Sequence, residues 1–319
     1  MTLLAAKVSG QALRLATHEE LAQQTAAFFN RGLEGALNTQ LAYRSDLNQL
    51  RQWLQRRELA DLPLTPATLA AYLSDEATRH KWATLSRRLA AIRKWHRLHQ
   101  HPDPALDQTV QTVLEGIKRT LGTEPGQALA FDIEEFKAKI RSIPLTPAGL
   151  RERALLLVGF VGAFRRSELV ALNIESVQFT REGAVVTYQG SKTNQYGKTE
   201  QKALFFSPDP DTCPVRALQD YTMVLDRATG PLFVRFRKGN HITGDRLSDK
   251  QVARTTKTYL GQEYSAHSLR ASFVTIAKLN GADDSQIMQQ TKHRTRTMID
   301  RYTRVQQVVR HNAAMKLGL

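Results

Sequence analysis

Seven side chains in the second half of the sequence belong to types that bind and transfer phosphoryl groups. In chain order they are Arg165, Glu168, Lys192, His267, Arg270, His293 and Tyr302. A guanidinium group donates paired hydrogen bonds to an anion and stays charged at physiological pH, so Arg165 and Arg270 suit the non-bridging oxygens of a phosphodiester. Displacement at phosphorus builds charge on these oxygens, and its catalysis consists mainly of positioning and electrostatic stabilisation. We therefore interpret the two arginines as a phosphate clamp.

The candidate nucleophile of this set is Tyr302. A tyrosine near its free pKa of about 10 attacks weakly, so a base or cationic surroundings must activate it. His267 is the natural base, because it lies three residues before Arg270 and would share a helix face with it. An ester between Tyr302 and a phosphate retains the energy of the phosphodiester, so the step could be reversed without ATP or metal.

Composition points to a polyanionic partner. The chain has 319 residues, with 45 Lys plus Arg against 30 Asp plus Glu, and a formal net charge of +15. Such an excess favours nucleic acid, and the 41% hydrophobic content indicates a globular protein. The start of the chain lacks a signal-peptide pattern, and no window approaches the roughly 18 apolar residues of a membrane span. We expect a cytoplasmic protein.

The sequence offers little to hold a metal ion or a nucleotide. It has no GxxxxGK[ST] loop, and its carboxylates form no tight metal-binding group. The single cysteine, Cys213, excludes a disulfide within the chain, and its place before a proline predicts a structural role. His96, His99 and His101 have ligand-like spacing, but no cysteine or carboxylate cluster completes a site. We expect no metal and no cofactor, and we expect surface or DNA contacts from the three histidines.

The apolar pattern predicts two domains joined by a short linker. The first domain is predicted at residues 1–122, and its pattern is helical nearly throughout from Thr17 to Gly122, starting with a possible capping box at Thr17 and Glu20. The sequence GTEPGQ then combines glycine and proline without an apolar side chain, which predicts a linker at residues 123–127.

The second domain, residues 128–319, mixes helices with a few short strands. Three runs at 177–179, 184–189 and 202–206 favour β-structure and are separated by turn-like residues. Helices are expected to return from Pro214 to the C-terminus. The predicted fold is therefore mainly α, with a small antiparallel β-sheet in the second domain.

A basic helix is predicted in the first domain. Its basic residues, which accompany a regular apolar stripe, are Arg87, Arg88, Arg93, Lys94 and Arg97. A run of charges on a helix is usually only a solvated face, but the net charge of +15 favours contacts with phosphates. We therefore predict that these five residues bind DNA.

Four motifs follow one another in the second domain: GAFRRSELVAL (162–172), GSKTNQYG (190–197), HSLR (267–270) and HRTRTMIDRY (293–302). Each motif alone is weak, because such segments are common in unrelated proteins. In this order they resemble the tyrosine recombinase family of site-specific DNA recombinases, which includes phage integrases and chromosome-dimer resolvases. That family has an arginine helix, a hairpin lysine, a His-x-x-Arg box, and a late histidine followed nine residues on by tyrosine. Here 302 − 293 = 9.

The resemblance implies which residues bind the phosphate. Arg165 and Arg270 match the family's two arginines, and Glu168 matches its supporting carboxylate, although it could simply cap its helix. His293 matches the late histidine that hydrogen-bonds the phosphate.

The resemblance also implies which residues form and break bonds. Tyr302 matches the nucleophile that forms a 3′-phosphotyrosyl bond, and Lys192 matches the hairpin lysine that acts as general acid. Lys198 and Lys202 lie in the same hairpin region and compete for that assignment. Two departures are Ala271, where a histidine is frequent, and Lys292, where a glycine is frequent. Neither departure removes a catalytic group, so we expect changed local packing or changed phosphate contact and no loss of activity.

The implied architecture is a C-shaped clamp around duplex DNA. Residues 1–122 would be a helical, SAM-like core-binding domain, and residues 128–319 the catalytic domain with a C-terminal helical tail. The implied partners are a DNA site with inverted repeats and a homotetramer on two such sites, with protomers linked through their tails. The implied tasks are integration, excision or resolution of DNA.

Three other functions compete with this interpretation. A type IB topoisomerase uses similar chemistry, but the small helical first domain argues against it. A noncatalytic architectural DNA-binding protein would be expected to lack one or more of the six catalytic residues. None is missing from the set Arg165, Lys192, His267, Arg270, His293 and Tyr302. A metal-dependent nuclease would need Mg²⁺ and would form no covalent adduct.

Overall fold

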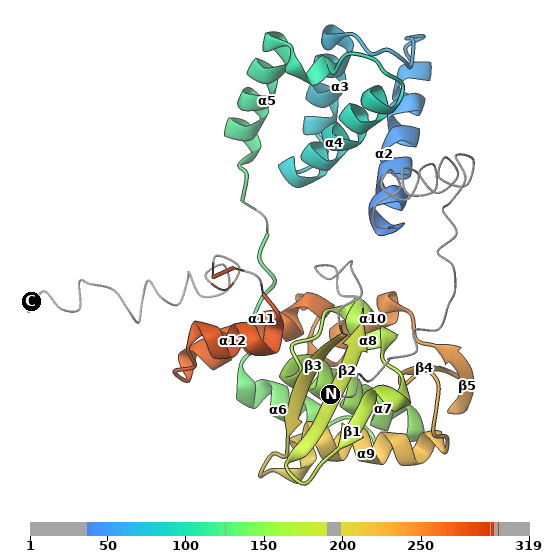
Figure 1. Cartoon of the computed structure of the whole chain (residues 1–319), viewed down its shortest axis with the longest axis vertical. Coiled ribbons are helices and arrows are strands. Elements are labelled where there is room, and N and C mark those ends of the chain that lie inside the picture. The colour runs from blue at the N-terminus through green and yellow to red at the C-terminus, as the bar shows by residue number, and fades with distance from the viewer. Residues whose placement is uncertain (1–36, 125, 190–198, 294, 297–298, 300–319) are drawn as a thin grey trace, which may run out of the picture. The chain divides into compact units, whose positions relative to one another are not determined.

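The chain folds into two compact units. The computed structural model describes residues 37–124, 126–189, 199–293, 295–296 and 299. The units are Met1–Pro125 and Gly126–Leu319 (Figure 1), and their division falls within the glycine- and proline-containing segment described above. The predicted capping box at Thr17 and Glu20 lies outside the described residues.

The first unit packs helices around one apolar core. Its helices are α2 (Leu37–Gln55), α3 (Pro66–Ala77), α4 (Trp82–Leu98) and α5 (Gln108–Leu121), with a 3₁₀ turn η1 (Pro104–Leu106) before α5. The Thr65 hydroxyl accepts a hydrogen bond from the Thr68 amide and so caps α3, while Asp107 caps α5. The buried apolar stripes include Leu50, Leu54, Leu69, Leu73, Leu85 and Ile92. The predicted helical character is confirmed in the part of this unit that the structure describes.

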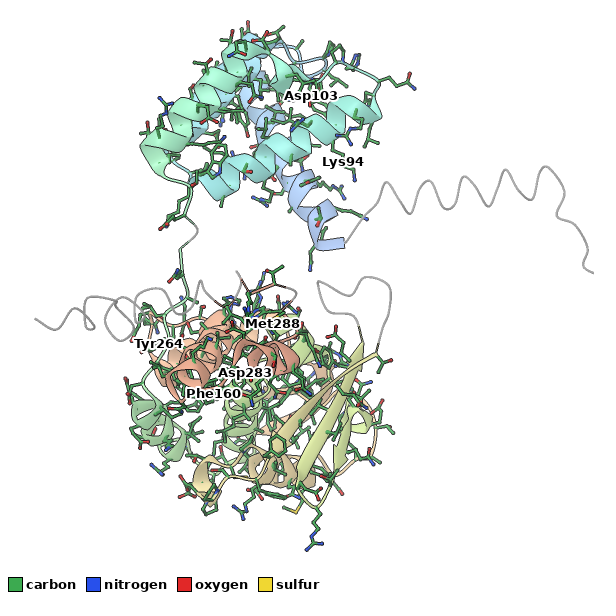
Figure 2. The ribbon with its side chains drawn as sticks, turned by 60° about the vertical axis from the view of Figure 1, so that its left-hand side comes forward. Lys94, Asp103, Phe160, Tyr264, Asp283 and Met288 are labelled. Atoms are coloured by element: carbon green, nitrogen blue, oxygen red, sulfur yellow. The ribbon has the colours of Figure 1, made fainter. Side chains whose placement is uncertain are left out.

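The second unit is built around α7 (Pro147–Val161), which buries residues on nearly every face. The other helices are α6 (Ile133–Arg141), α8 (Arg166–Ala171), α9 (Pro214–Leu225), α10 (Asp249–Leu260), α11 (Ala266–Leu279) and α12 (Asp284–Thr291), with 3₁₀ turns η2 (Ile174–Ser176) and η3 (Pro210–Thr212). A helix that is apolar all round must be enclosed, and both α9 and α11 pack against α7. Phe160, near the end of α7 (Figure 2), joins Phe131 and Phe136 in an aromatic cluster. Among the described helices, none is long and apolar enough to span a bilayer.

A three-stranded antiparallel sheet lies beside these helices. Its strands, in the order β1-β2-β3, are β1 (Val177–Phe179), β2 (Gly183–Gln189) and β3 (Thr199–Phe205). The register places Val186 opposite Lys202 and Tyr188 opposite Glu200. The prediction of a small antiparallel sheet from these three runs is confirmed. The segment between β2 and β3, which contains Lys192, lies outside the described residues.

The prediction of helices alone from Pro214 to the C-terminus is wrong. Strands β4 (Val234–Arg237) and β5 (His241–Arg246) form a second antiparallel hairpin. The chain reverses through Gly239 and Asn240, which have φ angles of 81° and 61°, in the left-handed region where these residue types are favoured. Exposed basic and polar side chains fill most of both strands, so no alternating apolar pattern marks them in the sequence.

Candidate active site

Arg165 lies in the turn between α7 and α8, where Glu168 holds it. The backbone N–H of Arg165 donates to Glu168 Oε2 at 2.9 Å, and Nη1 of its guanidinium donates to Oε1 at 2.5 Å. Glu168 is buried, whereas 18% of the Arg165 side chain is accessible to solvent. One buried carboxylate therefore fixes both the backbone and the guanidinium of a cation that solvent can still reach.

α11 carries His267 and Arg270 one turn apart. The Ser265 hydroxyl caps this helix by accepting a hydrogen bond from the His267 amide at 3.2 Å. Arg270 is only 1% exposed; its Nη1 donates to Ala163 O at 2.7 Å, and its Nη2 donates to Thr291 O. Because Ala163 belongs to the α7–α8 turn, Arg270 connects α11 to the turn that holds the other arginine.

The ring of His293 lies against Arg270 at the end of α12. Lys292 ends the helix in the left-handed conformation, with φ at 55°, which accounts for glycine as an alternative at this position. Arg270 Nε donates to His293 Nε2 at 3.3 Å, and His293 Nδ1 lies 3.0 Å from the Thr291 hydroxyl. That hydroxyl donates in turn to Ile287 O at 2.7 Å. Since Nε2 accepts a hydrogen bond, the assignment that satisfies every partner puts the imidazole proton on Nδ1.

Both imidazoles of the cluster are held in the neutral form. Burial and then the charges of Arg270 and Arg165 lower the pKa of His293 to about 3. Desolvation and the same two guanidinium charges also lower the pKa of His267. Arg270 contacts both His293 and the turn that carries Arg165, and His267 lies one helical turn before it on α11. These contacts bring the four predicted site residues into one region of the second unit.

Lys202 joins this cluster from β3, although the sequence marks it only as a competitor of Lys192. Its side chain is fully buried, and Nζ donates to Gly162 O at 2.8 Å and to Ala163 O at 3.1 Å. Glu168 Oε2 lies 3.7 Å from the same nitrogen. Lys202 lies two residues before Leu204, so both side chains point to the same, buried face of β3. This alternation is the sequence signal that could have identified Lys202 as a buried lysine.

Lys192 and Tyr302 lie outside the described residues. Their roles as general acid and nucleophile therefore stay predictions. The structure brings together the other predicted members of the site, which are Arg165, Glu168, His267, Arg270 and His293.

His96 is buried, contrary to the expected surface or DNA contact. Its Nε2 accepts a hydrogen bond from the Leu64 amide at 3.0 Å, so its Nδ1 carries the proton that is donated to Ile92 O at 3.0 Å. Both ring nitrogens are thus used by the backbone, because His96 follows Ile92 by one helical turn on the inner face of α4. Among the described residues, no group of three or more His, Cys, Asp or Glu side chains could hold a metal ion.

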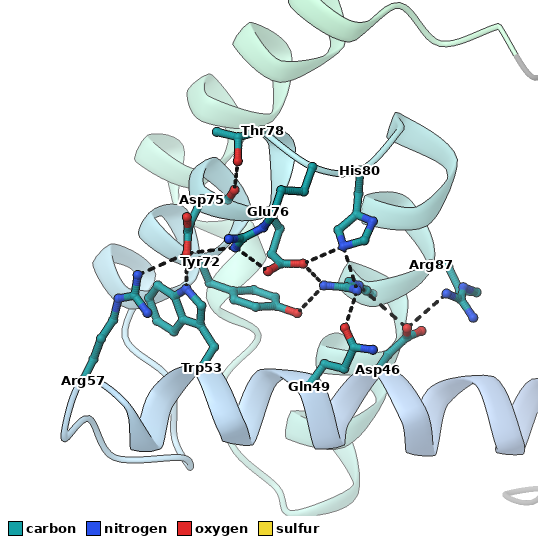
Figure 3. A network of polar contacts seen from close by, with 12 residues as sticks. Asp46, Gln49, Trp53, Arg57, Tyr72, Asp75, Glu76, Thr78, His80 and Arg87 are labelled. Atoms are coloured by element: carbon teal, nitrogen blue, oxygen red, sulfur yellow. Dashed lines mark hydrogen bonds and ion pairs between the residues drawn. The ribbon is translucent and has the colours of Figure 1, made fainter.

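Arg88, predicted to contact DNA, lies instead in a buried polar network of the first unit (Figure 3). Its guanidinium pairs with Glu76, donates to the Tyr72 hydroxyl at 3.1 Å, and donates to Gln49 Oε1 at 2.6 Å. The prediction is wrong because Arg88 precedes the buried Ile92 by four residues and so shares the inner face of α4.

The other four basic residues of α4 reach the surface, and Arg87 and Arg93 are paired there with carboxylates. Arg87 lies 3.1 Å from Asp46, and Arg93 lies 2.6 Å from Asp103. Arg97 is exposed. These pairs reduce the positive charge that Arg87 and Arg93 present to an anion.

Lys94, which projects from α4 (Figure 2), lines an open groove of about 600 Å³ between α2 and α4. The polar side chains that α2 contributes to the groove are Gln40, Tyr43, Arg44, Asn48 and Arg51. Trp95 forms part of the wall, with the guanidinium of Arg51 5.2 Å from its ring centroid. No pattern in the sequence indicated the α2 residues, because the two helices that form the groove become neighbours only in the fold.

Comparisons with known proteins cover both units. The model of the phage integrase family matches residues 129–308, and the model of the phage integrase N-terminal SAM-like domain matches residues 29–100. The chain is 33% identical over 299 residues to the integrase/recombinase xerD homolog of Selenomonas ruminantium, a match that covers 88% of this chain and 85% of that protein. It is 28% identical over 283 residues to the tyrosine recombinase XerC of Myxococcus xanthus, covering 82% and 85%.

Solved structures share the fold. The XerH site-specific recombinase bound to palindromic difH substrate, in a post-cleavage complex, gives a TM-score of 0.65 at 17% identity, covering 92% of this chain and 85% of that one. A lambda integrase dimer bound to a COC′ core site gives a TM-score of 0.59 at 17% identity, covering 90% and 95%. The family model spans more than half of the chain and the Selenomonas relative is similar along most of it, so this chain belongs to the phage integrase family of tyrosine recombinases.

Proposed function

We propose that this protein is a site-specific recombinase that breaks and rejoins duplex DNA through a 3′-phosphotyrosyl bond to Tyr302. The observation that carries the proposal is the convergence of Arg165, Arg270, His267 and His293 on one region, from the α7–α8 turn, from α11 and from the end of α12. Two fixed cations beside two neutral imidazoles suit one phosphodiester. The cations stabilise charge on its oxygens, while the imidazoles can exchange protons with reacting groups.

The cleavage step is an in-line displacement at phosphorus. The phenolic oxygen of Tyr302 forms a bond to phosphorus while the bond to the 5′ oxygen breaks. The phenolic proton passes to His267, which can accept it because its lowered pKa keeps it neutral. Lys192 donates a proton to the leaving 5′ oxygen. A 5′-hydroxyl of another strand reverses these steps, so rejoining needs no external energy.

The first unit would contribute affinity for the DNA backbone. Arg44, Arg51 and Lys94 place three cations around the groove between α2 and α4, and Asn48 adds an amide that could read a base edge. Lys94 and Arg97 thus remain as predicted DNA contacts, with Arg87 and Arg93 available where their carboxylate partners are displaced.

The proposed assembly is a homotetramer on two inverted-repeat sites, in which each protomer closes as a C-shaped clamp on DNA. Residues 1–122 would form the core-binding domain and residues 128–319 the catalytic domain. The tail after Tyr302 would dock on a neighbouring protomer, and the protein would act in the bacterial cytoplasm. If every tail docks on the next protomer in the same way, the contacts close into a ring, which is the symmetry expected of a homotetramer.

A plasmid with two directly repeated copies of the DNA site separates this function from its competitors. The expected result in EDTA is two circles from one, with no product when one site is deleted. Relaxation of any supercoiled plasmid without such circles would indicate a type IB topoisomerase. Linear products that need Mg²⁺ would indicate a nuclease, and binding without strand exchange would indicate an architectural protein.

A further inference from the structure

We propose that Lys202 is a positioning residue that fixes the two clamp arginines relative to each other. It acts on Arg165 through Glu168. It acts on Arg270 through the carbonyl oxygen of Ala163. This inference rests on the proposed recombinase function, and it concerns a side chain that is fully buried and hydrogen-bonded to backbone carbonyls.

Lys202 and Arg270 share one acceptor. Lys202 Nζ lies 3.1 Å from Ala163 O, and Arg270 Nη1 lies 2.7 Å from the same oxygen. A carbonyl oxygen has two lone pairs and can accept both hydrogen bonds. Ala163 has a φ of 46°, in the left-handed region that a residue with a side chain rarely adopts, so the two cations hold a strained backbone in place. A second hydrogen bond from Lys202 to Gly162 O, at 2.8 Å, anchors the preceding residue.

Lys202 and Arg165 share one carboxylate. Glu168 Oε2 lies 3.7 Å from Lys202 Nζ and also accepts the hydrogen bond from the Arg165 backbone. Burying a charged carboxylate is costly unless cations lie close to it, and among the described residues Arg165 and Lys202 form ion pairs with Glu168. The negative charge of Glu168 is therefore balanced by Lys202 as well as by Arg165, while Glu168 orients Arg165.

A buried lysine at this strand position calls for a role beyond packing. Its nitrogen lies 4.2 Å from the centroid of the Phe164 ring and 5.5 Å from that of Tyr188. Burying a charge is costly unless the charge is paired. An apolar side chain at position 202, like that of the nearby Leu204, would fill the space without this cost. Burial, partly offset by Glu168, lowers the pKa of Lys202 to about 7. An anion bound between the arginines would favour its charged form.

The test measures covalent adduct formation in a single turnover, with the full chain on its DNA site. Lys202→Met should bind DNA as tightly as the wild type but form the adduct with a rate constant lower by roughly 10²-fold, the cost of slight misplacement of catalytic groups. Lys202→Arg, which keeps the charge, should recover part of that rate. A partly misfolded preparation would lower the amplitude of adduct formation and leave the rate constant of the folded fraction unchanged.

Two control variants separate positioning from general destabilisation. Gln201→Met changes an exposed neighbour on β3 and should leave the rate constant unchanged. Arg151→Met removes another buried cation of the same unit, one that pairs with Glu152 and donates to Val234 O, and it should lower stability without changing the rate constant. If Lys202→Met does not fold, Lys202→Gln takes its place. The rate constant of Lys202→Gln should then be lower than that of Lys202→Arg, which should be lower than that of the wild type.

A double-mutant cycle tests the route through Glu168. In a Glu168→Gln background, Lys202→Met should slow the reaction less than it does in the wild type, because part of its action passes through the carboxylate. A wild-type rate constant in Lys202→Met, equal rates for Lys202→Met and Lys202→Arg, or additive effects in the cycle would overturn the inference. Absence of any adduct with the wild-type protein would instead overturn the proposed function.

Discussion

Arg165 and Arg270 bind one phosphate in our account, yet they are held in different ways. Arg270 is 1% exposed and donates hydrogen bonds to two backbone carbonyls and to His293. Arg165 is partly accessible and is oriented by Glu168. The buried arginine therefore also serves the fold, while the accessible one serves mainly the ligand.

Conservative replacements should separate these two roles. Arg165→Lys and Arg270→Lys should both slow adduct formation, because an ammonium lacks the planar fork that matches a phosphate. Only Arg270→Lys should also lower the free energy of unfolding, by about 1–3 kcal/mol, since it leaves buried carbonyls unpaired. Urea unfolding and adduct kinetics measure the two effects. Equal losses of stability in the two variants would contradict the assigned difference.

The neutral histidine gives the stability a pH dependence. The pKa of His293 is about 3 in the fold and near 6.5 in the unfolded chain, so between these values the unfolded state binds the extra proton. The free energy of unfolding should therefore fall as pH decreases through this window, by roughly 1.4 kcal/mol per pH unit from this residue. Unfolding of His293→Gln, measured beside the wild type from pH 7.5 to 5, should lack this contribution. Parallel curves for both proteins would exclude it.

At the scale of elements, the α7–α8 turn does most of the positioning. It presents Arg165, offers the Ala163 carbonyl to Arg270, and receives Lys202 from β3. Gly162 permits the turn, because a Cβ at this position would lie 2.3 Å from the Phe164 ring and 2.7 Å from Val158 O.

Gly162→Ala should displace Phe164 and with it the arginine turn. We expect slower adduct formation and a lower melting temperature, since the ring and a helix carbonyl cannot both give way without strain. Gly116→Ala, in α5, is the matched control: a Cβ there meets nothing within 4 Å, so it should stabilise the protein slightly, by roughly 0.5–1 kcal/mol. Calorimetry and adduct kinetics report both outcomes. Unchanged kinetics in Gly162→Ala would contradict the positioning role of the turn.

The local sequence pattern predicted where helices and strands lie better than it predicted which of their side chains are buried. The apolar period, the Thr65 cap and the three β-favouring runs gave helices and strands where the structure has them. Arg88 was assigned to the wrong face, because its buried partners lie on two other helices. Lys202 was passed over for a similar reason, since the carbonyls it binds lie about forty residues away in the α7–α8 turn. The five described site residues were found from their order along the chain, which needed no knowledge of packing.

At the scale of the whole molecule, the formal charge of +15 should make DNA binding strongly dependent on salt. Each phosphate contact contributes about 0.9 to the slope of log K against log salt concentration. Lys94→Ala should reduce that slope by about one contact. Arg88→Leu should leave the slope unchanged while lowering the stability of the first unit by about 3–5 kcal/mol, because Glu76 loses its buried partner. A reduced slope in Arg88→Leu would restore it as a DNA contact.

The covalent bond to Tyr302 is the central claim, and one measurement tests it directly. Protein is mixed with its DNA site in EDTA, denatured, and separated by electrophoresis, beside the Tyr302→Phe variant at equal DNA occupancy. Our account predicts a denaturation-resistant complex with the 3′ phosphate of the cleaved strand attached to the wild-type protein, and none with Tyr302→Phe, which still binds DNA. An undiminished adduct in Tyr302→Phe would contradict it.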